Sequence, residues 1–284
     1  MRRRLWSIVY SATTLFLAAV ISAPATLAWG NGGYSSDPNY PDYGIHDWIA
    51  DKALAFQSAS VGFLLTTYHS DYLIGTEAPD NGAYIGDSYN HHVYYTSSGS
   101  LQTDIGAVRA RAMYQSALSS LKASDFEQAA YYAGAMAHYI ADVGAYGHTM
   151  GPNTVWGTSP HHSDYESHAG TLLGSLTAPT ASALPGRDAY NATLSLARET
   201  TFGSGAIETN IWMEANYDWS DAQFRASWLE SLNESVRAVA AALGQLLSEA
   251  GFSAVPEFWS PVGVVLASTA ILLILKRGRT PPSG

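Results

Sequence analysis

The sequence predicts an all-α protein with a single helical domain. Apolar residues recur at intervals of three and four through most of its central part, as one buried helix face requires. No run of alternating apolar and polar residues forms a convincing strand ladder, and no segment repeats. About 230 residues lie between two distinctive ends of the chain, which is enough for one domain with a substantial core.

The first end of the chain has the three-part layout of a secretory signal peptide. Three arginines stand near the start, an apolar run extends from Leu5 to about Ile21, and small residues follow it. Cleavage after Ala25 or after Ala28 would suit these small residues, and cleavage after Ala28 would make Trp29 the first mature residue. We therefore expect an exported protein.

The other end is typical of a membrane anchor. Phe258 to Leu275 form an uncharged apolar run of 18 residues, and three basic residues follow closely. As a helix such a run spans about 27 Å, close to the hydrocarbon thickness of a bilayer, and the basic tail favours a cytoplasmic end. A buried core helix is the alternative. Pro256 and Glu257 before this run also resemble the short signal of some archaeal sorted proteins, which implies exchange of the tail for a lipid.

These ends divide the chain into three expected parts. They are a signal peptide over residues 1–28, a helical domain over 29–255, and a hydrophobic anchor with a basic tail over 256–284. We expect a monomer on the extracytoplasmic face of the cell membrane, where its transmembrane segment anchors it.

The body between the two ends is acidic and has no cysteine. Of the 14 lysines and arginines, 8 remain when the basic residues at the two ends are left out, against 24 acidic residues. This balance disfavours electrostatic capture of nucleic acid without excluding it, and it suits cation binding. Without cysteine the chain forms no disulfide, so any metal must be held by His, Asp, Glu or backbone groups.

The helices are predicted in chain order from these patterns. Residues 30–44 are rich in Gly, Ser, Asn and Pro and form an irregular lead-in, and a helix begins at Ile45 with His46 in its first turn. Residues 70–100 are loop-like. Three ligand-type side chains fall in this loop: Asp80, His91 and His92.

Further helices are expected over residues 105–121, 126–143, 159–173, 187–200 and 222–250. Ser124 and Glu127 are expected to form a capping box for the helix over 126–143. Glycines and Pro152 then end that helix and place His148 in the turn beyond it.

Two pairs of metal-type ligands are the most informative motif. His138 with Asp142, and His162 with Glu166, are each four positions apart, so both members of a pair lie on one face of a helix. The candidate ligands in chain order are His46, Asp80, His92, His138, Asp142, His148, His162 and Glu166. Because zinc takes three or four protein ligands, this set implies two or three ions and favours a metal-dependent hydrolase.

The spacing of these ligands resembles that of the bacterial zinc-dependent phospholipases C, including the phosphatidylcholine-hydrolysing enzymes. The paired His138 and Asp142, the following His148, and the paired His162 and Glu166 match that family's order and intervals. The family's mature chain begins with a Trp whose amino group and carbonyl oxygen bind zinc. Cleavage after Ala28 would supply this group.

The resemblance implies three zinc sites. Trp29, His46 and Asp142 would hold one ion, Asp80, His92, His138 and Asp142 a second with Asp142 bridging, and His148, His162 and Glu166 a third. The segment from Asp80 to His92 looks shortened, and His91 competes with His92 for the ligand role. The Val-Tyr that follows His92 resembles the aromatic pair after the family's ligand, which favours His92.

The function implied is that of a phospholipase C, which releases a phosphorylated head group through attack of a metal-bound hydroxide on the phosphodiester. Asp80 would orient or deprotonate the attacking water. One rival is the single-strand-specific zinc nucleases, which share the fold but whose last ligand pair is more distant from the preceding His and ends in Asp rather than Glu166. Another is a surface-anchored zinc-binding protein without catalysis.

Overall fold

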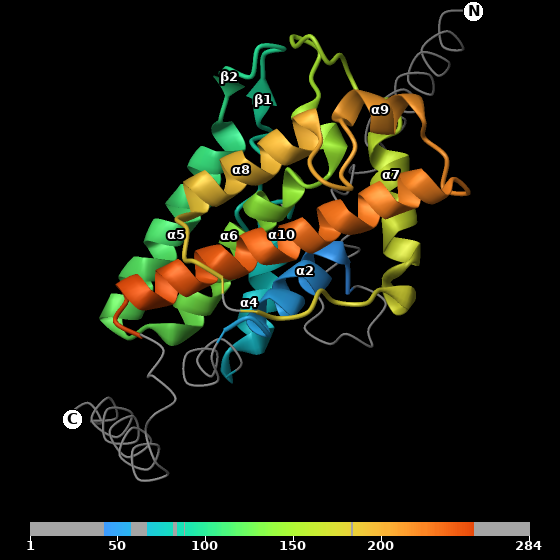
Figure 1. Cartoon of the computed structure of the whole chain (residues 1–284). Coiled ribbons are helices and arrows are strands. Elements are labelled where there is room, and N and C mark those ends of the chain that lie inside the picture. Colours follow the sequence, from blue (N-terminus) through green and yellow to red (C-terminus); the bar gives the residue numbers. More distant parts are fainter. Residues whose placement is uncertain (1–42, 58–66, 82–83, 88, 183, 253–284) are drawn as a thin grey trace, which may run out of the picture.

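The computed structural model describes residues 43–57, 67–81, 84–87, 89–182 and 184–252 (Figure 1). The expected signal peptide, Trp29, the C-terminal apolar run and the expected domain boundaries all lie outside these residues. Among the residues described, no helix is both long and apolar enough to cross a bilayer.

The described part of the chain is mainly α-helical, as the sequence predicts. Its helices are α2 (Ile45–Leu54), α4 (His69–Glu77), α5 (Ile105–Ala123), α6 (Phe126–Asp142), α7 (His162–Thr171), α8 (Ala189–Phe202), α9 (Asn210–Ala215) and α10 (Ala222–Glu249). Two 3₁₀ turns, η2 (Tyr146–Thr149) and η3 (Leu173–Ser175), precede and follow α7. The long helix α10 runs across the bundle in Figure 1.

Helix α6 lies at the centre of this bundle and contacts α2, α4, α5, α8 and α10. Every residue from Ala133 to Asp142 is buried, and many of them are alanines. Small side chains let neighbouring helices approach α6 on several sides, so its C-terminal half becomes the core of the domain. The two ligand-type residues of this half, His138 and Asp142, therefore lie in the interior.

Two glycines bring α4 against α6. A Cβ atom added at Gly134 would lie 1.9 Å from the carbonyl oxygen of Tyr72, and one at Gly75 would lie 2.1 Å from that of Tyr131. The two backbones therefore touch at a point where no larger residue fits. This contact fixes the end of α4, and the loop that carries Asp80, beside α6.

The structure corrects three local predictions. Helix α4 replaces the start of the expected loop, because packing on α6 stabilises a segment whose Ser, Asp, Gly and Thr residues favour helix only weakly. A small antiparallel hairpin, β1 (Tyr94–Tyr95) with β2 (Leu101–Thr103), also falls in the expected loop. Ser124 does not cap α6, since it closes α5 in a left-handed conformation and Asp125 accepts the capping bond from Gln128 N.

Candidate metal centre

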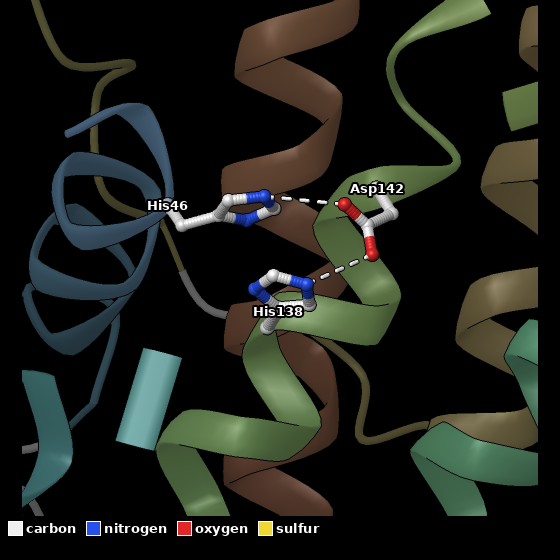
Figure 2. A group of neighbouring side chains, drawn as sticks. All are labelled: His46, His138 and Asp142. Carbon is white, nitrogen blue, oxygen red and sulfur yellow. Dashed lines mark ion pairs between the residues drawn. The ribbon is translucent and has the colours of Figure 1, made fainter. Parts of the chain in front are cut away.

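The first cluster joins the start of α2 to the end of α6 (Figure 2). His46 Nε2 lies 3.1 Å from Asp142 Oδ1, and His138 Nε2 lies 3.2 Å from Asp142 Oδ2. The His46 and His138 rings are stacked with centroids 4.0 Å apart. The pair on α6 has the geometry that its four-residue spacing predicts, and α2 adds the third side chain.

The second cluster contains Asp80, His91 and His138. Asp80 Oδ1 lies 3.7 Å from His91 Nδ1, and Asp80 Oδ2 lies 3.9 Å from His138 Nε2. His91 Nδ1 also lies 2.7 Å from Asp142 Oδ2. This cluster therefore shares His138 with the first one and borders on the same carboxylate.

The third cluster contains His148, His162 and Glu166. Glu166 Oε1 lies 2.8 Å from His162 Nε2 and 3.1 Å from His148 Nε2. His148 Nε2 is also 3.7 Å from Asp142 Oδ1. Asp142 thus lies within 4 Å of an imidazole nitrogen from every cluster, and the three groups form one continuous centre.

The structure brings His91, not His92, into this centre. His91 is 1% exposed and its Nε2 donates to the backbone carbonyl of Asp87 at 2.6 Å, which directs Nδ1 toward the carboxylates. The His92 ring is 5.0 Å from that of His148 and belongs to none of the three clusters. Burial alternates from His91 through Val93 to Tyr95, as successive side chains in an extended chain face opposite ways. The apolar Val93 was the sequence signal that could have identified His91.

Backbone contacts orient the ligands. His138 Nδ1 donates to the carbonyl oxygen of Thr76 at 2.5 Å, which leaves Nε2 facing the cluster. The Thr76 hydroxyl lies 2.6 Å from Asp47 Oδ1, so the end of α4 is tied to the helix that carries His46. These supporting contacts could not be predicted from the sequence, because they depend on how α4 packs.

Neighbouring imidazoles lower the pKa of two of the carboxylates, Asp142 and Glu166. Burial alone would raise the pKa of Asp142, but the imidazoles of His138, His91 and His148 hold it well below its usual range. Burial likewise opposes the hydrogen bonds from His148 and His162, which nevertheless lower the pKa of Glu166 to about 2. Both groups stay ionised at neutral pH, as a metal ligand must.

The histidines respond to the same environment in opposite ways. Burial lowers the pKa of His138 and of His148. Burial also acts to lower the pKa of His91, but the charge of Asp142 and a hydrogen bond to it raise that pKa to about 9. Metal binding at this cluster would therefore displace a proton from His91.

The donor set fits zinc. Ligand atoms bound at about 2.1 Å on a tetrahedral ion lie about 3.4 Å apart, close to the separations within these clusters. Asp142 Oδ1 and Asp80 Oδ2 are buried, and among the described residues neither has a hydrogen-bond partner of good geometry. Buried polar atoms left in this way are costly, and a cation held between them would satisfy them.

Comparison with known families identifies the family to which this chain belongs. The family model described as zinc dependent phospholipase C matches residues 45–202, more than half of the chain. The chain belongs to the zinc-dependent phospholipase C family. The match includes every residue of the three clusters and ends before α9 and α10.

Two solved structures show the same fold as this family member. The alpha toxin from Clostridium absonum is 14% identical with a TM-score of 0.58, over 78% of this chain and 66% of the toxin chain. The alpha-toxin of a Clostridium perfringens avian strain is 17% identical with a TM-score of 0.56, over 78% of this chain and 65% of that one. This chain thus spans just under two thirds of either toxin. A comparison with curated proteins found no match.

Proposed function

We propose that the protein is a zinc-dependent phosphodiesterase that acts as a phospholipase C, releasing a phosphorylated head group from a phospholipid. The observation that carries this proposal is the position of Asp142, whose carboxylate lies within 4 Å of imidazoles from all three clusters. A carboxylate in this position can bridge ions, and a multi-ion site suits displacement at phosphorus.

In this proposal three zinc ions are held by the described clusters and by Trp29, which lies outside the described residues. Trp29, His46 and Asp142 would hold the first ion, Asp80, His91, His138 and Asp142 the second, and His148, His162 and Glu166 the third. His91 replaces His92 in this assignment because of the contacts above. Zinc when bound supplies Lewis-acid activation of water and neutralises the phosphate oxygens.

Asp80 is the carboxylate placed to act on the reacting groups. Its side chain is 13% exposed, whereas those of Asp142 and Glu166 are 0% and 3% exposed. Burial and the nearby charge of Asp142 act to raise the pKa of Asp80, although the neighbouring His138 opposes them. Asp80 is the least buried of these three carboxylates, so in this proposal it is the one that orients the attacking water.

We also propose that the protein works outside the cell as a monomer. Residues 1–28 would direct export and cleavage after Ala28 would free the amino group of Trp29, so the first ion could bind only after export. Residues 256–284 would anchor the domain to the membrane, either directly or through an exchanged lipid. An anchored domain would stay close to phospholipid substrate.

The test uses the full chain produced in a host that exports it. The metal-loaded protein, the chelated protein and the Asp80→Asn variant are each given a chromogenic phosphocholine ester, phospholipid vesicles and single-stranded DNA. We expect zinc-dependent hydrolysis of the ester and the lipid and a large loss in Asp80→Asn. Cleavage of DNA alone would favour a nuclease, and no cleavage of any substrate by protein with full zinc would favour a non-catalytic zinc protein.

A further inference from the structure

The third cluster depends on two short segments that do not belong to the same helix. His148 lies in the 3₁₀ turn η2, and His162 is the first residue of α7. The connection between them contains a bridge between Gly151 and Gly157 but no helix. Contacts from outside this connection can therefore help to set the separation of the two histidines.

Helix α9 contacts both segments through one carboxyl group. Glu214 Oε2 accepts hydrogen bonds from Ser159 Oγ at 2.6 Å and from Tyr146 Oη at 3.2 Å, and Glu214 Oε1 pairs with His161 Nδ1. Tyr146 precedes His148 by two residues in η2. Ser159 and His161 lie directly before His162, so Glu214 joins the two ligand-bearing segments.

A second residue of α9 strengthens the contact with η2. The buried amide of Asn210 lies 3.2 Å from both the carbonyl oxygen and the hydroxyl of Thr149, the last residue of that turn. Helix α9 itself begins at a Thr209 cap that accepts from Trp212 N at 3.1 Å. The carboxyl of Glu214 is therefore presented from a fixed helix, with only 15% of its side chain exposed.

The turn and α7 also meet with no free space. A Cβ atom added at Gly147 would lie 2.5 Å from Cδ2 of His162. The imidazole of His162 thus rests on the backbone of η2 one residue before His148. Any change in the separation of these segments would move His148 relative to His162 and Glu166, which both lie on α7.

From these contacts we propose that Glu214 is a positioning residue for the third zinc site, and that α9 serves as a clamp on its two histidine-bearing segments. The clamp lies beyond the residues that the family model matches. Glu214 touches none of the clustered ligand atoms and acts through Ser159, His161 and Tyr146. Residues that bond a metal ligand directly typically contribute 10–100-fold to metal affinity, and Glu214 lies one contact further out, so its contribution should fall at or below the lower end of that range.

The proposal rests on the three-zinc site of the proposed function, and its test measures zinc binding without turnover. Zinc affinities of the exported full chain are measured by chelator competition for the parent, Glu214→Gln, Ser159→Ala, His162→Ala and the double variant His162→Ala with Glu214→Gln. Gln keeps one acceptor oxygen where Glu has two, so one half of the clamp is lost. Glu208→Gln is the control. Glu208 Oε1 accepts a hydrogen bond from Gln223 Nε2 at 2.6 Å, and Gln223 belongs to neither η2 nor α7.

We expect Glu214→Gln to weaken one zinc equivalent by up to about 10-fold and leave the other two unchanged. In the His162→Ala background the same change should have no further effect on zinc affinity, because the site that it supports is already absent. Ser159→Ala should weaken the same equivalent by a smaller factor, and Glu208→Gln should match the parent.

Parent affinities in Glu214→Gln, an equal loss at all three equivalents, or an undiminished effect in the His162→Ala background would each overturn the proposal. If Glu214→Gln does not fold, Ser159→Ala decides the matter, and unchanged affinities in that variant would overturn it. A parent that binds three zinc ions but hydrolyses no phosphodiester would refute the proposed function and leave this inference standing.

Discussion

Replacing Asp142 by asparagine tests whether this carboxylate is shared by two zinc ions. The side chain is fully buried and lies within 4 Å of imidazole nitrogens from four histidines, His46, His91, His138 and His148. In the proposed site this group ligates two of the three zinc ions. An amide of the same shape removes the negative charge and one of the two oxygen ligands, so we expect the zinc content to fall from about three ions to about one per chain.

The loss of two sites also sets the expected change in stability. Zinc at about 100 times its Kd stabilises the folded state by about 2.7 kcal/mol per site, so two sites contribute about 5 kcal/mol. In a domain of this size each kcal/mol shifts Tm by about 2–4 °C, which gives a fall of roughly 10–20 °C in the zinc-saturated Tm.

The assay combines zinc content after dialysis with thermal unfolding in the presence and absence of zinc. Asp188→Asn is the control, because Asp188 caps α8 from the surface and touches no cluster. We expect that control to keep three zinc ions. Full zinc content and an unchanged zinc-dependent gain in Tm for Asp142→Asn would refute the bridging role.

Three further predictions follow from the same contacts. His91→Ala should weaken zinc binding strongly and His92→Ala only slightly, as measured by chelator competition, and the reverse order would restore His92 as the ligand. Gly134→Ala should destabilise the metal-free protein by about 3 kcal/mol or more in urea unfolding, because the added Cβ would collide with the backbone of Tyr72. Gly174→Ala is the control and should be nearly neutral, because a Cβ there has nothing within 4 Å. Equal effects of the two changes would contradict the close contact of α4 with α6. Because the pKa of His91 is raised to about 9, zinc binding at pH 7.5 should release a proton from it, and calorimetry in buffers of different ionisation enthalpy should detect that release in the parent but not in His91→Ala.

The raised pKa of His91 also has a consequence for the stability of the metal-free protein. A histidine whose folded pKa lies above its unfolded value stabilises the fold below about pH 6.5, and that contribution is lost as the pH rises through about 9. Glu166 has the opposite sign. Its contribution is present above about pH 4 and is lost as the pH falls toward its folded pKa of about 2.

The helical class and the two ligand pairs were predictable because they rest on local periodicity. The four-residue spacing of His138 and Asp142, and of His162 and Glu166, sets each pair on one helix face wherever that helix lies. The structure places both pairs as predicted. It also brings His46, Asp80 and His148 to the same centre.

The features that the sequence did not predict depend on how the helices pack and on which way a side chain faces. Helix α4 was missed because Gly75 favours a loop locally, and only the approach of Gly134 on α6 explains its presence there. The choice between His91 and His92 depends on which side chain faces inward, and the hydrogen bond of His91 to the Asp87 carbonyl favours His91. The clamp by Glu214 spans more than fifty residues, and no local pattern could have indicated it.

The most direct test of the central claim is an anomalous difference map at the zinc absorption edge, from crystals of the exported, zinc-loaded protein. We expect three peaks, one at each cluster, with Asp142 between the first two and the amino group of Trp29 completing the first. A single peak, or peaks away from these clusters, would contradict a three-zinc centre.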